Sequence, residues 1–139
     1  MRVSRFLLAA GMAVLVGVGS MSLVSAQAKS DEDYEKLMKA VGAANGAVRK
    51  ATGADQAAEA AKLVTLFKDS QAFWTARNNK EAGDWSAAAA MHADELAKAA
   101  KAGNADAAAG HLKELGGMCQ SCHGKYREKT ETGFAIKKG

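Results

Sequence analysis

The sequence GGMCQSCHGKY, residues 116–126, lies close to the C-terminus of the 139-residue chain. Within it Cys119, Cys122 and His123 stand three and four residues apart, so a helix here would carry all three on one face. The spacing C-x-x-C-H is typical of covalent haem attachment, in which two thiols add to the haem vinyl groups and the adjacent imidazole ligates the iron. The chain has only these two cysteines. We therefore predict one covalent haem c, with His123 as the proximal iron ligand.

Two other kinds of site can contain a Cys-x-x-Cys pair. A thioredoxin-like redox pair requires a preceding strand within a βαβ unit, whereas residues 107–115 have a helical pattern. A structural zinc site requires further ligands, such as a second Cys or His pair at a recognisable spacing. His92 and His111 do not stand at such a spacing. Haem attachment is therefore favoured over both alternatives.

Residues 1–26 have the layout of a secretory signal peptide. Arg2 and Arg5 precede an apolar run over residues 6–24, and a small-residue Val-Ser-Ala cleavage signal ends at Ala26. We expect cleavage after Ala26 and export to a bacterial periplasm, with no stable membrane insertion afterwards. The alternative is an uncleaved anchor, but the apolar run is near the minimum of about 17 to 20 residues for a membrane span.

The expected mature chain, residues 27–139, has the size of one domain. Removing 26 of the 139 residues leaves 113, and it removes two of the 19 basic residues and no acidic one. The remaining 17 basic and 15 acidic residues give a net charge of +2. A basic patch with interleaved aromatic residues is absent from the sequence, so we expect no nucleic-acid partner.

The mature chain is predicted to be all-α. It is rich in alanine, contains no proline and lacks the alternation of apolar and polar residues that indicates strands. Ser30 and Asn104 are expected helix N-caps, and the tail after Thr130 is expected to fray. Heptad-type apolar spacing and short connections predict an antiparallel, up-down-up-down four-helix bundle. The expected helices cover residues 30–52, 55–77, 84–103 and 104–129, with a break at Asn78-Asn79 after the second.

The second axial ligand of the iron would decide what such a haem does. Met38, Gly42 and Gly46 stand at i, i+4 and i+8, on one face of the first helix. Glycine inside a helix costs about 1 kcal/mol relative to alanine, so two on one stripe suggest that something bulky approaches the backbone. A haem beside Met38 would explain the stripe. The alternative is a tight helix–helix contact with Met38 as core filler; Met91 and His92 are further candidate ligands.

The C-terminal motif resembles that of the class II cytochromes c, the family of the cytochromes c′ and their low-spin relatives. The resemblance extends over essentially the whole mature chain. It implies a left-handed antiparallel four-helix bundle with the haem between its helices. The pattern that carries the resemblance is Gly116-x-x-Cys119-x-x-Cys122-His123-x-x-Tyr126-Arg127. Three alanine-rich amphipathic helices are expected before it.

The first helix carries a second part of this resemblance. In the low-spin branch the distal ligand is a methionine, often in a Leu-Met-Lys run followed by glycine, as in Leu37-Met38-Lys39 and Gly42 here. The resemblance thus implies Met38 as the distal iron ligand. In cytochromes c′ an arginine one turn earlier contacts a haem propionate. This sequence has Tyr34 there, so Arg49, Arg77 or a lysine would have to replace it.

Several other residues have expected places around the haem. Gly42 would leave room for it, Tyr126 would cover its edge or proximal side, and Arg127 would shield the imidazole or contact a propionate. The structural alternative for Arg127 is a charge that complements the helix C-terminus. His92 is expected to be a partly buried, hydrogen-bonded residue, and His111 is expected to face solvent.

Histidine–methionine ligation leaves the iron no open site and raises its reduction potential relative to bis-nitrogen ligation. The sequence therefore predicts a periplasmic one-electron carrier that meets unidentified redox proteins. No enzymatic activity is expected, because no carboxylate pair or nucleophile–base arrangement stands out. The alternative is a five-coordinate cytochrome c′ that binds nitric oxide or carbon monoxide, with Met38 only lining the pocket. A sensor or assembly module with a structural haem is a third class. A homodimer is left open, since many members of the family form one.

Overall fold

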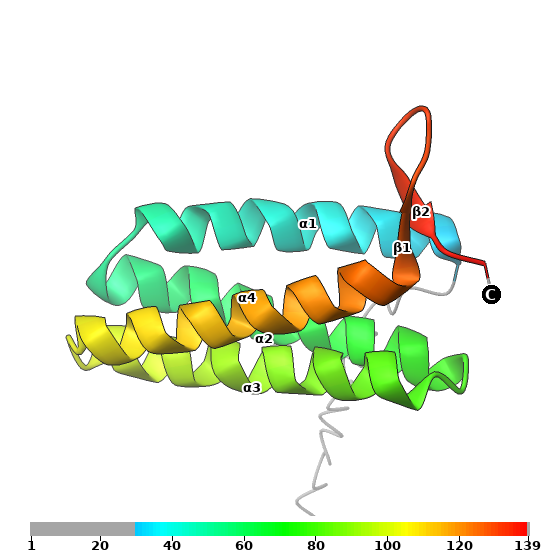
Figure 1. Ribbon diagram of the computed structural model, residues 1–139. Helices are drawn as coiled ribbons and strands as arrows, with labels where there is room; N and C mark the ends of the chain where they lie inside the picture. The colour runs from blue at the N-terminus through cyan, green and yellow to red at the C-terminus, as the bar shows by residue number, and fades with distance from the viewer. Residues whose placement is uncertain (1–29, 139) are drawn as a thin grey trace, which may run out of the picture.

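The computed structural model describes residues 30–138, which form four helices and a short hairpin (Figure 1). The prediction of four helices is confirmed for this part of the chain. The predicted signal peptide, residues 1–26, lies outside it. Within residues 30–138 no helix is both long and apolar enough to cross a membrane. The elements are α1 Asp31–Lys50, α2 Gly53–Ala76, α3 Lys80–Lys101, α4 Ala105–Tyr126, β1 Arg127–Lys129 and β2 Phe134–Ile136.

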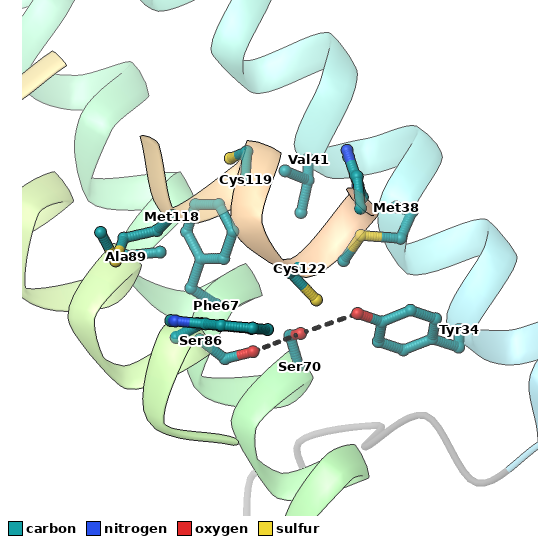
Figure 2. Close-up of a pocket in the computed structure, with 12 residues that line it drawn as sticks. Tyr34, Met38, Val41, Phe67, Ser70, Ser86, Ala89, Met118, Cys119 and Cys122 are labelled. Carbon is teal, nitrogen blue, oxygen red and sulfur yellow. Dashed lines mark hydrogen bonds between the residues drawn. The ribbon is translucent and has the colours of Figure 1, made fainter. Parts of the chain in front are cut away.

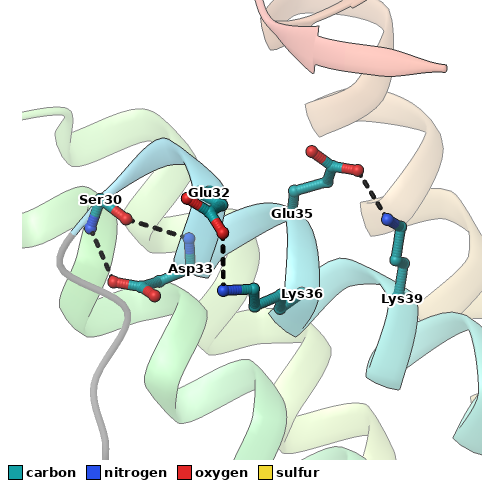
Figure 3. A network of polar contacts seen from close by, with 6 residues as sticks. All are labelled: Ser30, Glu32, Asp33, Glu35, Lys36 and Lys39. Carbon is teal, nitrogen blue, oxygen red and sulfur yellow. Dashed lines mark hydrogen bonds and ion pairs between the residues drawn. The ribbon is translucent and has the colours of Figure 1, made fainter. Parts of the chain in front are cut away.

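The predicted caps at Ser30 and Asn104 are confirmed. The Ser30 hydroxyl accepts a hydrogen bond from the Asp33 amide at 3.1 Å, and the Asp33 carboxylate accepts one from the Ser30 amide at 3.2 Å (Figure 3). This reciprocal pair satisfies two of the free amides at the start of α1. The Asn104 side chain likewise accepts a hydrogen bond from the Ala107 amide at 3.1 Å.

The third helix begins earlier than predicted, at Lys80 instead of Asp84. The side chain of Asn79 accepts a hydrogen bond from the Ala82 amide at 3.1 Å and caps this earlier start. The break itself lies at Asn78-Asn79, as the sequence indicates. Asn78 has φ of 56°, a left-handed conformation that asparagine adopts more readily than most residues.

The prediction of a frayed tail is wrong. Helix α4 ends at Tyr126 instead of continuing to Lys129, and β1 pairs antiparallel with β2. A turn joins the strands, with the Thr130 amide donating to the Gly133 carbonyl at 2.9 Å. The Arg127 guanidinium lies 4.2 Å from the centre of the Phe134 ring. These contacts, together with β2 packing on α1, hold the tail in place.

Each helix packs on the next one in the chain, α1 on α2, α2 on α3 and α3 on α4, whereas the backbones of α1 and α4 stay further apart and meet through side chains of the core. A core runs between the packed pairs. Val48, Leu63, Leu96 and Leu115, one from each helix, are fully shielded from solvent. Burying such a side chain contributes about 1.5–3 kcal/mol. In Figure 1 the four helices lie lengthwise beside one another, and the hairpin stands at the beginning of α1.

A chain of buried hydrogen bonds ties α1, α2 and α3 together. The Ser86 hydroxyl donates to the Ala82 carbonyl at 2.9 Å, so it must accept from Ser70 at 2.9 Å. Ser70 in turn must accept from the Tyr34 hydroxyl at 3.1 Å, which accepts from the Trp74 indole at 2.8 Å. The proton directions are thus all determined, since a hydroxyl has a single hydrogen to donate.

Replacing Ser70 by alanine should break this chain at its centre. The Tyr34 hydroxyl would lose its acceptor and the Ser86 hydroxyl its donor, both in a buried setting. We expect Ser70→Ala to lower the free energy of unfolding by about 1–3 kcal/mol, measured by urea denaturation. Ser121→Ala is the matched control, because Ser121 is exposed; it should change stability by less than about 0.5 kcal/mol. Equal effects of the two substitutions would contradict the role assigned to the chain.

Candidate functional site

A groove with a volume of about 830 Å³ lies between α1, α4 and the hairpin. This volume is in the usual range of about 300–1,000 Å³ for small-molecule and cofactor sites. The groove brings together the seven residues predicted to ligate, attach, cover or make room for the haem, but not Gly46, the third member of the α1 stripe. The seven are Met38 and Gly42 on α1, Cys119, Cys122, His123 and Tyr126 on α4, and Arg127 at the start of β1.

The α4 wall carries the C-x-x-C-H residues on one helix face. Cys119, Cys122 and His123 are all partly buried, and both cysteines have free thiols. The same three residues also line a smaller inner cavity of about 40 Å³, which all four helices enclose. Figure 2 shows Cys122 of α4 and Met38 of α1 pointing into the space between their helices. All three residues line both the groove and the inner cavity, which agrees with their i, i+3, i+4 spacing on a helix.

Met38 is the α1 residue that meets this wall. It is partly buried, lines both the groove and the inner cavity, and packs against both hydrophobic clusters of the core. The two other sequence candidates for the distal position lie elsewhere. Met91 is 50% exposed, and the Nδ1 atom of His92 lies 3.3 Å from that of His111. Of the described methionine and histidine candidates for that position, Met38 alone faces Cys122 across the groove.

The two glycines of α1 are not sites of helix–helix contact. A Cβ atom added to Gly42 or Gly46 would meet no atom of the described residues within 4 Å, apart from the helix's own backbone. The alternative of a tight helix–helix contact is therefore wrong for this stripe. Gly42 lines the groove and leaves its α1 wall without a side chain there. A flat group could approach the helix backbone at this point.

The surroundings set the protonation of the α4 residues. Burial raises the pKa of Cys119, and burial together with the neighbouring Cys119 raises the pKa of Cys122 to about 11. A reactive redox pair has a thiol with a lowered pKa, whereas burial shifts the pKa of both cysteines here in the opposite direction. Burial, with a smaller contribution from the Arg127 charge, lowers the pKa of His123. The neutral imidazole that metal ligation requires is therefore favoured.

Tyr126 and the hairpin close one end of the groove. The Tyr126 hydroxyl donates to the Glu81 carboxylate at 2.7 Å, and its ring lies 5.3 Å from that of Trp74. The Lys137 amide donates to the Tyr126 carbonyl at 2.8 Å, which fastens β2 to the end of α4. The hairpin was not predicted, although the Gly133 turn followed by Phe-Ala-Ile is a recognisable strand signal.

Sequence reasoning also missed Asn45. Its side-chain oxygen is buried and has no hydrogen-bond partner among the described residues, and the residue lines the groove. A buried polar atom of this kind usually has a partner, so its position suits a bound polar group or water. The signal was present in the sequence, because Met38, Gly42 and Asn45 stand at i, i+4 and i+7 on one helix face.

The arginines proposed as replacements at the Tyr34 position lie outside the groove lining. Arg77 donates to the Asp31 carboxylate at 2.6 Å and covers the Phe73 ring at 3.6 Å. The Arg49 guanidinium lies close to Gly116, toward the middle of α4. The Tyr34 hydroxyl already donates to Ser70. The basic residues that do line the groove are Lys39, Arg127 and Lys138.

The chain matches no protein-family model, and no curated protein or solved structure is significantly similar to it.

Gly42→Ala should stabilise the protein when no cofactor is bound. The new methyl group would meet no neighbouring atom, and alanine in a helix interior is favoured over glycine by about 0.5–1 kcal/mol. Gly110→Ala on α4 is the matched control, because Gly110 is equally free of neighbours and is not among the groove-lining residues. Both variants should gain a similar unfolding free energy in thermal or urea denaturation. A loss of stability in Gly42→Ala alone would mean that α1 makes a close contact there.

Proposed function

We propose that the protein is a periplasmic c-type cytochrome of the class II kind that carries one electron at a time. One haem c would be attached through Cys119 and Cys122, with His123 and Met38 as axial ligands. The observation that carries the proposal is the convergence of these four residues on one groove. They come from helices at opposite ends of the sequence, so their spacing along the chain does not require this meeting.

The chemistry of the groove suits a haem. Its lining combines apolar side chains from α1, α4 and the hairpin with charged residues of both signs, the basic Lys39, Arg127 and Lys138 and the acidic Asp31, Glu32, Glu35 and Glu128. Gly42 keeps a stretch of helix backbone accessible, and the Asn45 oxygen is buried without a partner among the described residues. An apolar face suits a macrocycle, and the basic residues suit two carboxylates.

Each of the four proposed attachment and ligand residues would have its own part in holding the haem. The two thiols lie on the face of α4 that carries His123, so thioether bonds at those positions would keep the imidazole directed to the groove. The core contacts of Met38 restrict its side chain. A haem iron with these two ligands supplies reversible one-electron oxidation and reduction. The bundle contributes the constant position of both ligands.

We also propose that the helices run antiparallel, in up-down-up-down order. A helix of 20 residues is about 30 Å long, whereas a linker of two or three residues spans at most roughly 7–11 Å. The connections at residues 51–52, 77–79 and 102–104 are this short. Each connection can therefore join only helix ends that lie close together. Because consecutive helices also pack along each other, this supports an antiparallel arrangement.

Export and partners follow from the same proposal. Covalent haem would be attached outside the cytosol after removal of residues 1–26. The groove rim carries charges of both signs, including the Glu35–Lys39 ion pair at 2.7 Å (Figure 3). We propose that redox proteins dock near this rim, where a haem edge would be closest to solvent. Lys125 is not a free docking charge, because it pairs with Glu81.

Haem attachment is tested by mass spectrometry of the protein produced with a bacterial cytochrome c maturation system. We expect the mature chain plus one haem, and the combined Cys119→Ser and Cys122→Ser variant should lack the added mass. Gly42→Leu should reduce the haem-loaded fraction several-fold because its side chain would enter the groove, while Gly110→Leu should not. Wild-type protein without covalent haem would refute the proposal.

The axial ligands are tested by optical and electron paramagnetic resonance spectra of the ferric protein. Wild type should be low-spin with a far-red methionine–iron band. Met38→Ala should convert it to high-spin and open the iron to carbon monoxide. Met91→Ala is the control and should have the wild-type spectrum, because Met91 is half exposed and is not among the described residues that line the groove. A high-spin wild type would instead support a gas-binding cytochrome c′.

A further inference from the structure

His92 of α3 and His111 of α4 face each other across the helix interface. Their Nδ1 atoms are 3.3 Å apart, and their ring centres are 5.6 Å apart with planes inclined by 39°. Both residues are partly buried. The prediction that His111 faces solvent is therefore wrong, while the expectation of a partly buried, hydrogen-bonded His92 is confirmed. Neither residue is among those that line the groove or the inner cavity.

A shared proton is the simplest link between two such nitrogen atoms. One neutral imidazole can donate from Nδ1 only if the other has the tautomer that leaves its Nδ1 free to accept. The structural core does not require this arrangement, since Leu96 and Leu115, the residues four positions after each histidine, already bury the α3–α4 interface. The pair thus places two ring nitrogen atoms side by side. Apolar residues could fill these two positions if packing were their only role.

The separation of the two nitrogens matches a metal chelate. Zinc binds imidazole nitrogen at 2.0–2.1 Å in tetrahedral geometry, so two such ligands stand about 3.3 to 3.4 Å apart. The observed Nδ1–Nδ1 distance of 3.3 Å agrees without any movement of the helices. A divalent ion could therefore take the place of the shared proton.

We propose that His92 and His111 form a binding site for a divalent transition-metal ion of the zinc and copper class, separate from the groove. Imidazole nitrogen is a preferred ligand for these metals. Among the described residues no cluster of three or more His, Cys, Asp or Glu side chains could hold a metal, so water completes the coordination. The acidic residues that follow His92 in the sequence of α3, Asp94 and Glu95, both pair with Lys98, each at 2.7 Å.

The bound ion would cross-link α3 to α4, the helix that carries the C-x-x-C-H motif. An ion that binds the folded chain in preference to the unfolded one raises the stability of the fold by mass action. The melting temperature should therefore rise with metal concentration. The affinity should fall in acid, because protons compete with the metal for the imidazole nitrogens. These effects do not depend on what occupies the groove.

The test is a calorimetric titration of Zn²⁺ into the protein as purified, with any free thiols first blocked by iodoacetamide. We expect one Zn²⁺ per chain in wild type. His111→Gln and His92→Gln should each weaken binding roughly tenfold or more, because each removes half of the protein ligands while keeping a side chain that can form hydrogen bonds. Cu²⁺ should bind more tightly than Zn²⁺.

Lys113→Gln is the matched control, an exposed α4 residue two positions from His111, and it should bind Zn²⁺ like wild type. Added Zn²⁺ should raise the melting temperature of wild type and of this control, but not of the two histidine variants. The proposal is overturned if wild type binds no Zn²⁺ up to millimolar concentration. It is equally overturned if His111→Gln retains the wild-type affinity, since the metal would then bind elsewhere.

Discussion

The hydrogen-bonded chain from Trp74 through Tyr34 and Ser70 to Ser86 is the constraint on which the rest of the structure depends. It is buried, it joins three helices, and each hydroxyl group in it donates one hydrogen bond and accepts another. A shift of α1 relative to α2 would leave polar groups unpaired in the core, at a cost of about 1–3 kcal/mol for each group. Tyr34 precedes Met38 by one helical turn, so the same constraint sets where Met38 faces α4.

The groove follows from this arrangement. Helix α1 is held by α2, and α4 is held by α3, and α1 and α4 leave a groove along part of their facing sides. The hairpin then closes one end by packing β2 on α1 and fastening it to the end of α4. The proposed haem would join α1 to α4 across the groove, and the proposed metal site would join α3 to α4, whose backbones already pack together. The two sites act at different places along α4.

Much of the fold was readable from particular residues. Ser30, Asn104 and the Asn78-Asn79 pair mark helix boundaries by local chemistry, because a capping side chain bonds to amides two or three residues away. The sequence predicts a break at Asn79 but not its role as a helix cap, so the predicted start of α3 lies four residues after the observed one. The hairpin was missed because short strands depend on partners and packing more than on their own composition. The predicted exposure of His111 is wrong because it depends on the pattern of α4 alone, which does not include the contact with His92 on α3.

The sequence by itself determined the elements of local origin: four helices, the caps at Ser30 and Asn104, and the i, i+3, i+4 placement of Cys119, Cys122 and His123 on one helix. These depend on contacts within about one helical turn. Only the tertiary structure decided that Met38 and Gly42 lie across a groove from that motif, that Gly42 faces no neighbouring helix, and that His92 meets His111. Such meetings depend on how helices distant in sequence pack and rotate against one another, which helical periodicity restricts to a face but does not specify.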